Sequence, residues 1–153
     1  MQKLFMTRNK YKNKKYVVDG IEFSSQFESK CYTYLLTLKN NGIIKNLKTQ
    51  PVFLLMDGFK SPYYDGKNKK INKTKHRETT YVSDFEFIYL KNGKEYNVVL
   101  ETKGFIDQKY PIKKKWFLRL YGEDHIFLEL HRVKEFEQIT SIIDELIDLK
   151  YNQ

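Results

Sequence analysis

One part of the sequence constrains the fold more than any other, namely the two apolar segments on either side of Asn92-Gly93. An Asn-Gly pair between alternating apolar residues is the strongest short-range sign of a β-hairpin. Thr80–Leu90 and Lys94–Lys103 are therefore predicted to be antiparallel strands, with Lys91 facing Lys94 across a two-residue turn. In this register one face of the hairpin is a core surface. It consists of Phe85, Phe87 and Tyr89 against Tyr96, Val98 and Leu100.

The same register places charged residues on the opposite face of the hairpin. Asp84 comes to lie opposite Glu101, and Lys103 lies opposite Val82 on the same face. Two opposed carboxylates destabilise a hairpin by several tenths of a kcal/mol or more. A divalent cation would remove this cost, and Mg²⁺ prefers one or two carboxylates together with waters and phosphate oxygens. The residues alone leave two interpretations open, a metal-dependent nuclease site or a weak, solvated network of charges.

Around this hairpin the sequence predicts an α/β domain over residues 16–153, preceded by a basic arm at 1–15. Ser24 or Ser25 can cap the first helix, and Glu28 completes a capping-box spacing with Ser25. Residues 57–79 contain six lysines and no apolar period, so we expect a structureless loop that serves as a binding element. The other expected elements are a small hairpin around Asp19-Gly20, a helix from Phe27 to about Asn40, an extended segment from Ile43 to Met56 with an edge or break at Pro51, a helix over Tyr110–Tyr121, a strand over His125–His131 and a closing helix over Lys134–Lys150.

Composition narrows the class of partner. The formal charge is +9, which indicates a polyanion such as DNA. Most basic residues are lysines, which favours phosphate contacts over base reading. The chain has no alanine and much Lys, Asn, Ile and Tyr, so an AT-rich genome could account for part of the charge. The single cysteine, Cys31, excludes an intramolecular disulfide and a Cys-based zinc cluster. No apolar run is long enough to cross a bilayer, no export signal is evident, and we expect a cytoplasmic protein.

Asp84, followed by Glu101-Thr102-Lys103 and preceded by a helix that carries Glu28, resembles the PD-(D/E)XK nuclease superfamily. Ser83 stands where the superfamily usually has proline. The chain more closely resembles a phage-encoded endonuclease family related to Holliday-junction resolvases. The matching stretches span roughly residues 19–120 and are DGIEFSSQFESKCYTYL, IIKNLKTQPVF, TTYVSDFEF, VVLETKGF and YPIKKKWF.

The resemblance implies a restriction-endonuclease-like core in the order helix, three-stranded meander, helix and strand. It implies that Glu28, Asp84 and Glu101 hold Mg²⁺, or Mn²⁺, and that Lys103 is the catalytic lysine. Without the resemblance, Glu28 could be only a first-turn helix residue favoured by the dipole.

Further residues are candidates for contact with DNA. Gln50 could orient a ligand or a phosphate, or be a satisfied strand residue. Glu86 is a reserve metal ligand or a solvated side chain. Tyr110 and Trp116 could stack on unpaired bases. The helical spacing of Trp116 favours packing in the core over contact with bases. His125 and His131 are expected to satisfy local hydrogen bonds, and His76 to lie near phosphate. The basic candidates are Lys69, Lys70, Lys73, Lys75 and Arg77 in the polar loop and Lys113, Lys114 and Lys115 in the second helix.

The expected function is that of a magnesium-dependent endodeoxyribonuclease of phage or prophage type, acting on branched or recombining DNA in a bacterial host. Resolving a junction requires two coordinated cuts, which favours a homodimer. Two alternatives remain open at this point. One is a site-specific endonuclease of homing or transposition type, and the other is a noncatalytic DNA-binding protein with a nuclease fold.

Overall fold

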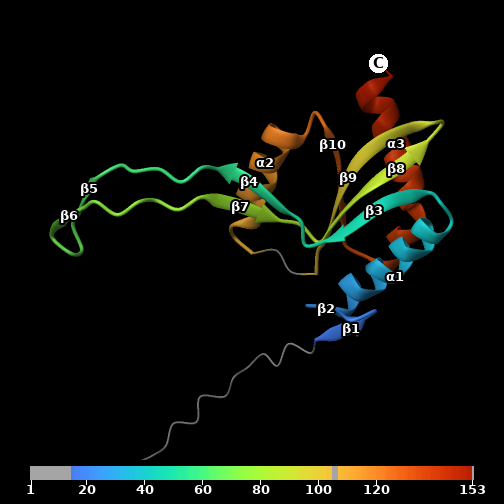
Figure 1. The fold of residues 1–153 in the computed structure, drawn as a ribbon, viewed down its shortest axis with the longest axis horizontal. Coiled ribbons are helices and arrows are strands. Elements are labelled where there is room, and N and C mark those ends of the chain that lie inside the picture. The colour runs from blue at the N-terminus through green and yellow to red at the C-terminus, as the bar shows by residue number, and fades with distance from the viewer. Residues whose placement is uncertain (1–14, 105–106, 153) are drawn as a thin grey trace, which may run out of the picture.

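The computed structural model describes residues 15–104 and 107–152. It is a mixed α/β structure built around a four-stranded sheet in the order β10-β9-β8-β3 (Figure 1). Strand β8 is antiparallel to both of its neighbours, β3 and β9, whereas β10 lies parallel to β9. The elements are β1 (Tyr16–Val18), β2 (Ile21–Phe23), α1 (Gln26–Asn40), β3 (Ile44–Thr49), β4 (Val52–Met56), β5 (Tyr63–Asp65), β6 (Lys70–Asn72), β7 (Thr79–Val82), β8 (Phe85–Lys91), β9 (Lys94–Thr102), α2 (Tyr110–Tyr121), β10 (His125–Leu130), the 3-10 helix η1 (Val133–Gln138) and α3 (Ile139–Tyr151).

The predicted central hairpin is confirmed in its register. Lys91 lies opposite Lys94 and Phe85 opposite Leu100. Asn92 and Gly93 have φ angles of 51° and 73°, as the turn preferred by twisted hairpins requires. On the predicted core face every residue is buried except Tyr96, which is partly buried. The local turn chemistry and the alternation of apolar residues therefore agree with the tertiary structure.

Apolar side chains pack on both faces of the sheet. The larger core joins one face to α1 and α3, and Cys31 is fully buried in it, as expected for a packing residue. The smaller core joins the other face to α2, β4 and β7 through residues such as Phe53, Val99 and Phe117. Trp116 is partly buried against this second core. Because Glu101 alternates with Val98 and Leu100 along β9, its side chain lies on the face of the smaller core.

One expected strand is broken in two. Thr80–Leu90 does not run straight through, because β7 leaves the main sheet at Ser83 and pairs with β4. The break at Ser83 follows from the neighbouring turn between β3 and β4. In that turn Gln50 adopts a φ of 51° before Pro51. Ser83 N–H donates to the Pro51 carbonyl at 3.2 Å, which ties the two turns together. The expected pairing of Lys103 with Val82 is therefore wrong, since Val82 pairs with Val52.

The expectation of a structureless loop at residues 57–79 is also wrong. Strands β5 and β6 pair in this segment, and Phe59 forms a bridge with His76. The segment continues the β4–β7 ribbon away from the body of the molecule (Figure 1). At its tip the Asp65 carboxylate accepts hydrogen bonds from the N–H groups of Lys67 and Asn68, which closes the turn. We call residues 57–79 the β-arm.

The remaining predicted elements are confirmed with small changes. The Asp19-Gly20 hairpin, the first two helices and the strand at 125–130 form as expected, whereas the closing helix is divided into η1 and α3. The predicted N-terminal arm lies outside the described residues apart from Lys15. No helix in the described ranges is long and apolar enough to cross a membrane.

Candidate functional site

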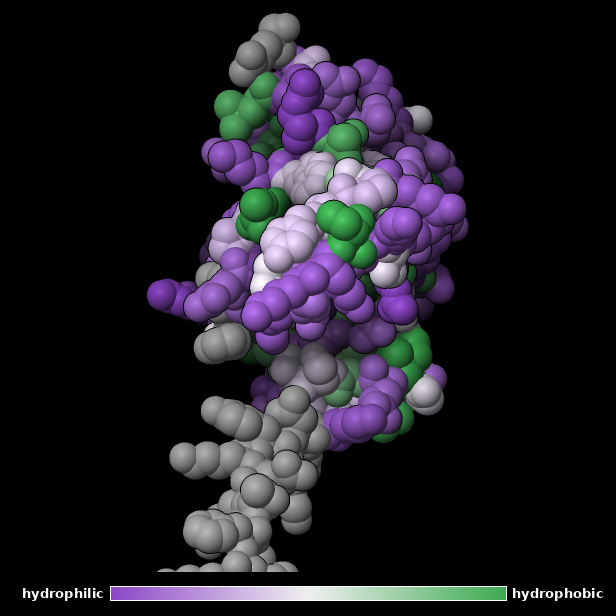
Figure 2. Space-filling model, turned by 90° about the vertical axis from the view of Figure 1, so that its left-hand side faces the viewer, coloured by the Kyte–Doolittle hydropathy of each residue, from purple (hydrophilic) through white to green (hydrophobic). Residues whose placement is uncertain are grey.

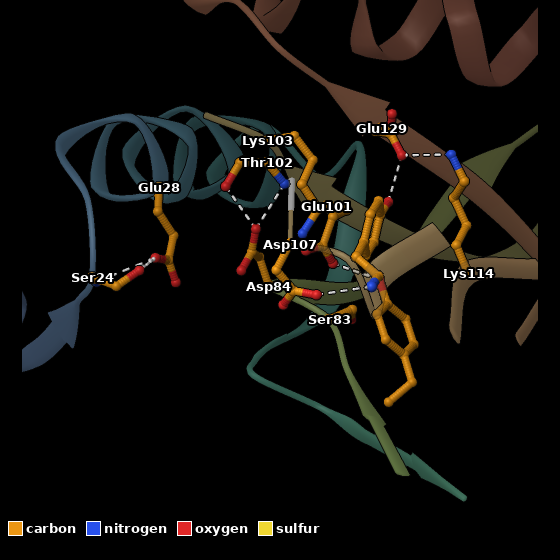
Figure 3. Close-up of polar contacts among 12 residues, drawn as sticks. Ser24, Glu28, Ser83, Asp84, Glu101, Thr102, Lys103, Asp107, Lys114 and Glu129 are labelled. Carbon is orange, nitrogen blue, oxygen red and sulfur yellow. Dashed lines mark hydrogen bonds and ion pairs between the residues drawn. The ribbon is translucent and has the colours of Figure 1, made fainter. Parts of the chain in front are cut away.

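The predicted catalytic residues come together in the structure. Glu28 from α1, Asp84 from the break between β7 and β8, and Glu101 and Lys103 from the end of β9 line one cavity of about 410 Å³. They arrive from three separate parts of the chain and form a group at the edge of the sheet (Figure 3). The site therefore depends on tertiary structure and not on a local turn.

Glu28 is held by the residues that begin α1. Ser25 is the N-cap, and its Oγ accepts a hydrogen bond from Glu28 N at 3.1 Å. The Glu28 carboxylate accepts hydrogen bonds at Oε2 from Ser24 Oγ at 2.6 Å and from Ser24 N at 3.2 Å. The capping box thus closes through Ser24. Burial raises the pKa of Glu28 and the charge of Asp84 adds to this increase, while the hydrogen bonds from Ser24 oppose it.

Asp84 follows β7 directly and is fixed by β9. The regular pairing of β8 with β9 ends at Phe85 and Leu100, so Asp84 stands one position beyond it, where Glu101 would be its partner. Its Oδ2 accepts hydrogen bonds from Thr102 N at 2.7 Å and Thr102 Oγ1 at 2.6 Å. Burial raises the pKa of Asp84, and the hydrogen bonds from Thr102 and the charge of Lys103 lower it by less.

Glu101 is 4% exposed and has a partner at each oxygen. Tyr81 OH donates to Oε2 at 2.5 Å, and Lys103 Nζ lies 2.5 Å from Oε1. The ammonium group also lies 3.7 Å from the centre of the Tyr110 ring, a favourable cation–π arrangement. Burial raises the pKa of Glu101, as does the charge of Asp84, and Lys103 and Tyr81 oppose the increase. The side chain is therefore held in one orientation with its charge only partly compensated.

The sequence did not reveal the parts played by Tyr81 and Tyr110. Both rings are buried in the smaller core, so Tyr110 packs inside the protein and is not placed to stack on bases. A tyrosine within a buried apolar pattern needs a partner for its hydroxyl, which is the sign that could have drawn attention to Tyr81.

The oxygen atoms of the site suit a hard divalent cation. Asp84 and Glu28 each take their hydrogen bonds at one oxygen, and within the described part of the chain no hydrogen bond uses Asp84 Oδ1 or Glu28 Oε1. In residues 15–104 and 107–152 no three acidic, histidine or cysteine side chains form a group that encloses a metal ion. Mg²⁺ commonly uses one or two carboxylates and fills its remaining positions with water and substrate. The donor set therefore fits Mg²⁺ without a complete protein cage.

The predicted DNA-contact residues lie in different places. Gln50 is exposed, and its N–H donates to the Asp84 carbonyl at 2.9 Å, so it stands beside the site. The basic candidates of the β-arm are all exposed on this extension: Lys69, Lys70, Lys73, Lys75 and Arg77. His76 lies in the same segment, where it stacks on Phe59. Glu86 lies outside the cavity and pairs with Lys48 at 3.2 Å.

The three lysines of α2 are not equivalent. Lys113 Nζ donates to the Thr80 carbonyl at 2.9 Å, and Lys114 Nζ lies 2.8 Å from Glu129, whereas Lys115 is exposed. Burial alone would raise the pKa of Glu129. Hydrogen bonds from Lys114, Tyr110 and His131 instead lower this pKa to about 2. Two of the three predicted phosphate contacts are thus already engaged within the protein.

The histidines of β10 differ in their surroundings. His131 pairs with Glu129 at 2.9 Å, which satisfies one ring nitrogen as expected. The Nδ1 atom of His125 is buried and has no hydrogen-bond partner among the described residues, so the expectation is wrong for this nitrogen.

Comparison with known proteins gives one match. The model of a protein family described as "Protein of unknown function (DUF1064)" matches residues 8–136, which is most of the chain. No curated protein and no solved structure matches it.

Proposed function

We propose that this chain, which belongs to the DUF1064 family, is a metal-dependent endodeoxyribonuclease of the PD-(D/E)XK type. The observation that carries the proposal is the convergence of Glu28, Asp84, Glu101 and Lys103 on one cavity. The order α1, β3, β8, β9, α2, β10 along the chain supports a restriction-endonuclease-like core with the β-arm as an insertion.

Glu28, Asp84 and Glu101 would hold Mg²⁺ or Mn²⁺ together with waters and phosphate oxygens, since no three side chains of the described residues enclose an ion by themselves. Burial raises the pKa of each of them, and the charge of Asp84 raises that of both others, so a cation would relieve an existing electrostatic cost. When bound, such a cation neutralises charge on the scissile phosphate and makes a bound water more acidic.

The residues of the chain would then position the reactants. Thr102 fixes Asp84 through two hydrogen bonds, and Tyr81 fixes Glu101. Lys103 places its ammonium group beside Glu101 Oε1, where it can orient the attacking water or stabilise negative charge that develops on the phosphate oxygens. The water oxygen would bond to phosphorus and give up a proton to solvent, while the P–O bond to the departing strand breaks and the departing oxygen takes up a proton from water.

The proposed substrate is branched or recombining DNA, in a phage or prophage setting within the bacterial cytoplasm. The charge of +9 favours a polyanion, and Gln50, Lys115 and the exposed basic residues of the β-arm are the contacts that we propose for it. A homodimer would supply the two cuts that a four-way junction requires.

The experiment compares a labelled four-way junction with a matched linear duplex and a single strand, in Mg²⁺, Mn²⁺ and EDTA. Lys103→Ala and Asp84→Asn are the test variants. Lys94→Ala, an exposed lysine at the opposite end of β9, is the matched control.

Paired symmetric cuts only in the junction, lost in EDTA and in both test variants, would establish the proposal. Cutting of every substrate would leave a nuclease and remove the preference for junctions. Cleavage at one sequence would indicate a site-specific enzyme. DNA binding without any cleavage would indicate a noncatalytic DNA-binding protein.

A further inference from the structure

The β-arm carries an opposed pair of apolar side chains that face solvent. Tyr64 on β5 lies directly opposite Ile71 on β6, so both stand on the same face of the ribbon. They are 64% and 56% exposed. Two large apolar residues paired at this exposure on a narrow extension gain little from folding, so folding alone does not explain them.

The opposite face of the ribbon packs on itself. Tyr63 accepts a hydrogen bond from Asn72 Nδ2 at 3.2 Å, and its ring centre lies 5.8 Å from that of His76. His76 in turn stacks on Phe59 at 4.7 Å. One face of the β-arm thus stabilises the ribbon, and the face with Tyr64 and Ile71 remains open.

The charge around this pair indicates the kind of partner. The β-arm contains six lysines and Arg77 against three acids, of which Asp57 and Glu78 stand at its base and Asp65 at its tip. The Asp65 carboxylate accepts hydrogen bonds from Lys67 N, Asn68 N and Asn68 Nδ2, so it serves the turn. Seen from the side to which the β-arm points, hydrophobic residues form separate patches among hydrophilic ones (Figure 2). A protein partner covering this face would have to supply many acids, whereas DNA supplies a phosphate on each side of every base step.

We propose that Tyr64 and Ile71 form a wedge that enters DNA at a weakly stacked base step, while the lysines of the β-arm contact the flanking phosphates. Apolar side chains inserted between base steps unstack and kink the duplex, and insertion is easiest where stacking is already interrupted. The inference rests on DNA as the partner in the proposed function and deepens it, because it explains a preference for branched over intact duplex DNA.

The position of the wedge limits its distance from the cut. β7 runs from the β-arm directly to Ser83 and Asp84. Strands rise about 3.3 Å per residue, so Ile71 lies at most roughly 43 Å along the ribbon from Asp84. One turn of B-DNA is about 34–36 Å long. The wedge would therefore meet the DNA within little more than one helical turn of the bond that is cut.

The test uses the full chain in EDTA, so that binding is separated from cleavage. A four-way junction carries 2-aminopurine at the branch point, and its fluorescence reports unstacking. Wild type should raise the signal. Tyr64→Thr/Ile71→Thr should abolish the rise and weaken junction binding at least about fivefold, as expected for a lost stacking contact. Val17→Thr, an exposed strand residue outside the β-arm, is the control and should behave as wild type.

A second variant keeps the wedge testable if the double variant fails to form the β5–β6 hairpin. Tyr64→Trp keeps an aromatic residue with high β-propensity, and its added emission should be quenched when the junction binds. Unchanged emission, or wild-type unstacking by the double variant, would overturn the wedge. A dimer that dissociates in the double variant would instead assign this face to a second copy of the chain.

Cleavage in Mg²⁺ is measured in parallel on the same junction. Cleavage that is present while no unstacking occurs would overturn the wedge and leave the nuclease proposal intact. Unstacking without cleavage would confirm the wedge and overturn the nuclease proposal.

Discussion

Replacing Asp84 by asparagine should inactivate the protein and at the same time stabilise it. Asp84 receives both of its hydrogen bonds at Oδ2, from Thr102 N and Thr102 Oγ1. The carbonyl oxygen of asparagine can accept both. The substitution also removes a charge that raises the pKa of Glu28 and of Glu101. In EDTA at neutral pH, the variant should therefore resist unfolding better than wild type.

The size of this effect follows from two opposing contributions. Hydrogen bonds to a charged acceptor stabilise a protein by about 1.5–3 kcal/mol and neutral ones by about 0.5–1.5, so two weakened bonds cost roughly 2 kcal/mol. Removing a partly buried and partly compensated charge gains roughly 3 kcal/mol by order of magnitude. Burial raises the pKa of Asp84 by more than its hydrogen bonds lower it. The net effect of the substitution on stability should therefore be favourable. The net gain should be about 1 kcal/mol, or roughly 3 °C in Tm for a chain of this length.

Thermal unfolding in EDTA across pH tests the reasoning. A raised carboxyl pKa contributes stability that is present at low pH and lost as the pH rises through the folded-state value. The advantage of Asp84→Asn should therefore be largest at neutral pH and fade toward pH 3.8, the ordinary pKa of Asp. Addition of Mg²⁺ should stabilise wild type more than the variant.

Asp107→Asn is the control, because the pKa of Asp107 is shifted in the opposite direction to that of Asp84. The Asp107 carboxylate accepts hydrogen bonds from Lys109 N and Tyr110 N, which lower its pKa. Its contribution is present above the ordinary Asp pKa and lost as the pH falls, so this variant should gain nothing at neutral pH. A fall in the Tm of Asp84→Asn at neutral pH, or a gain that persists unchanged in acid, would refute the view that Asp84 belongs to a group of repelling carboxylates.

The hydroxyl of Tyr81, the ammonium group of Lys103 and the lysines of the β-arm can each be tested by substitution. Tyr81→Phe removes only the hydroxyl that donates to Glu101, so denaturant unfolding should show a free energy of unfolding lower by about 1–3 kcal/mol. An unchanged free energy would mean that water replaces the donor. Lys103→Ala should slow junction cleavage about 10²–10³-fold with little change in binding in EDTA, and an equal loss of binding would make Lys103 a phosphate contact. Lys69→Gln with Lys73→Gln should reduce the slope of log K against log salt by about 0.9 for each lysine, and an unchanged slope would exclude both from the interface.

The sequence predicted those parts of the fold that local chemistry determines. The Asn92-Gly93 turn sets the register of β8 and β9, and that register brings Asp84 close to the end of β9. Glu28 is different, because nothing in its own segment relates it to β9. Its place at the site was implied by the resemblance to nucleases, and the packing of α1 on the sheet brings it there.

The β-arm could not be predicted from apolar periodicity. A two-stranded ribbon that protrudes into solvent has no buried face, so its sequence lacks the alternation that reveals a sheet strand. The break at Ser83 depends on the backbone of Gln50 and Pro51, which lies beside Ser83 and Asp84 because β3 pairs with β8. The hydroxyl partner of Tyr81 likewise depends on how β7 approaches β9, and that of Tyr110 on how α2 packs against β10.

We propose that the protein cuts DNA with the help of a metal ion, at the cavity lined by Glu28, Asp84, Glu101 and Lys103. The most direct measurement adds Mg²⁺ to preformed complexes of the four-way junction with wild type and with Asp84→Asn, and follows a single turnover on an end-labelled strand. We predict cleavage by wild type alone, although both proteins bind the junction in EDTA. Equal cleavage by the two proteins, or none by either, would contradict the claim.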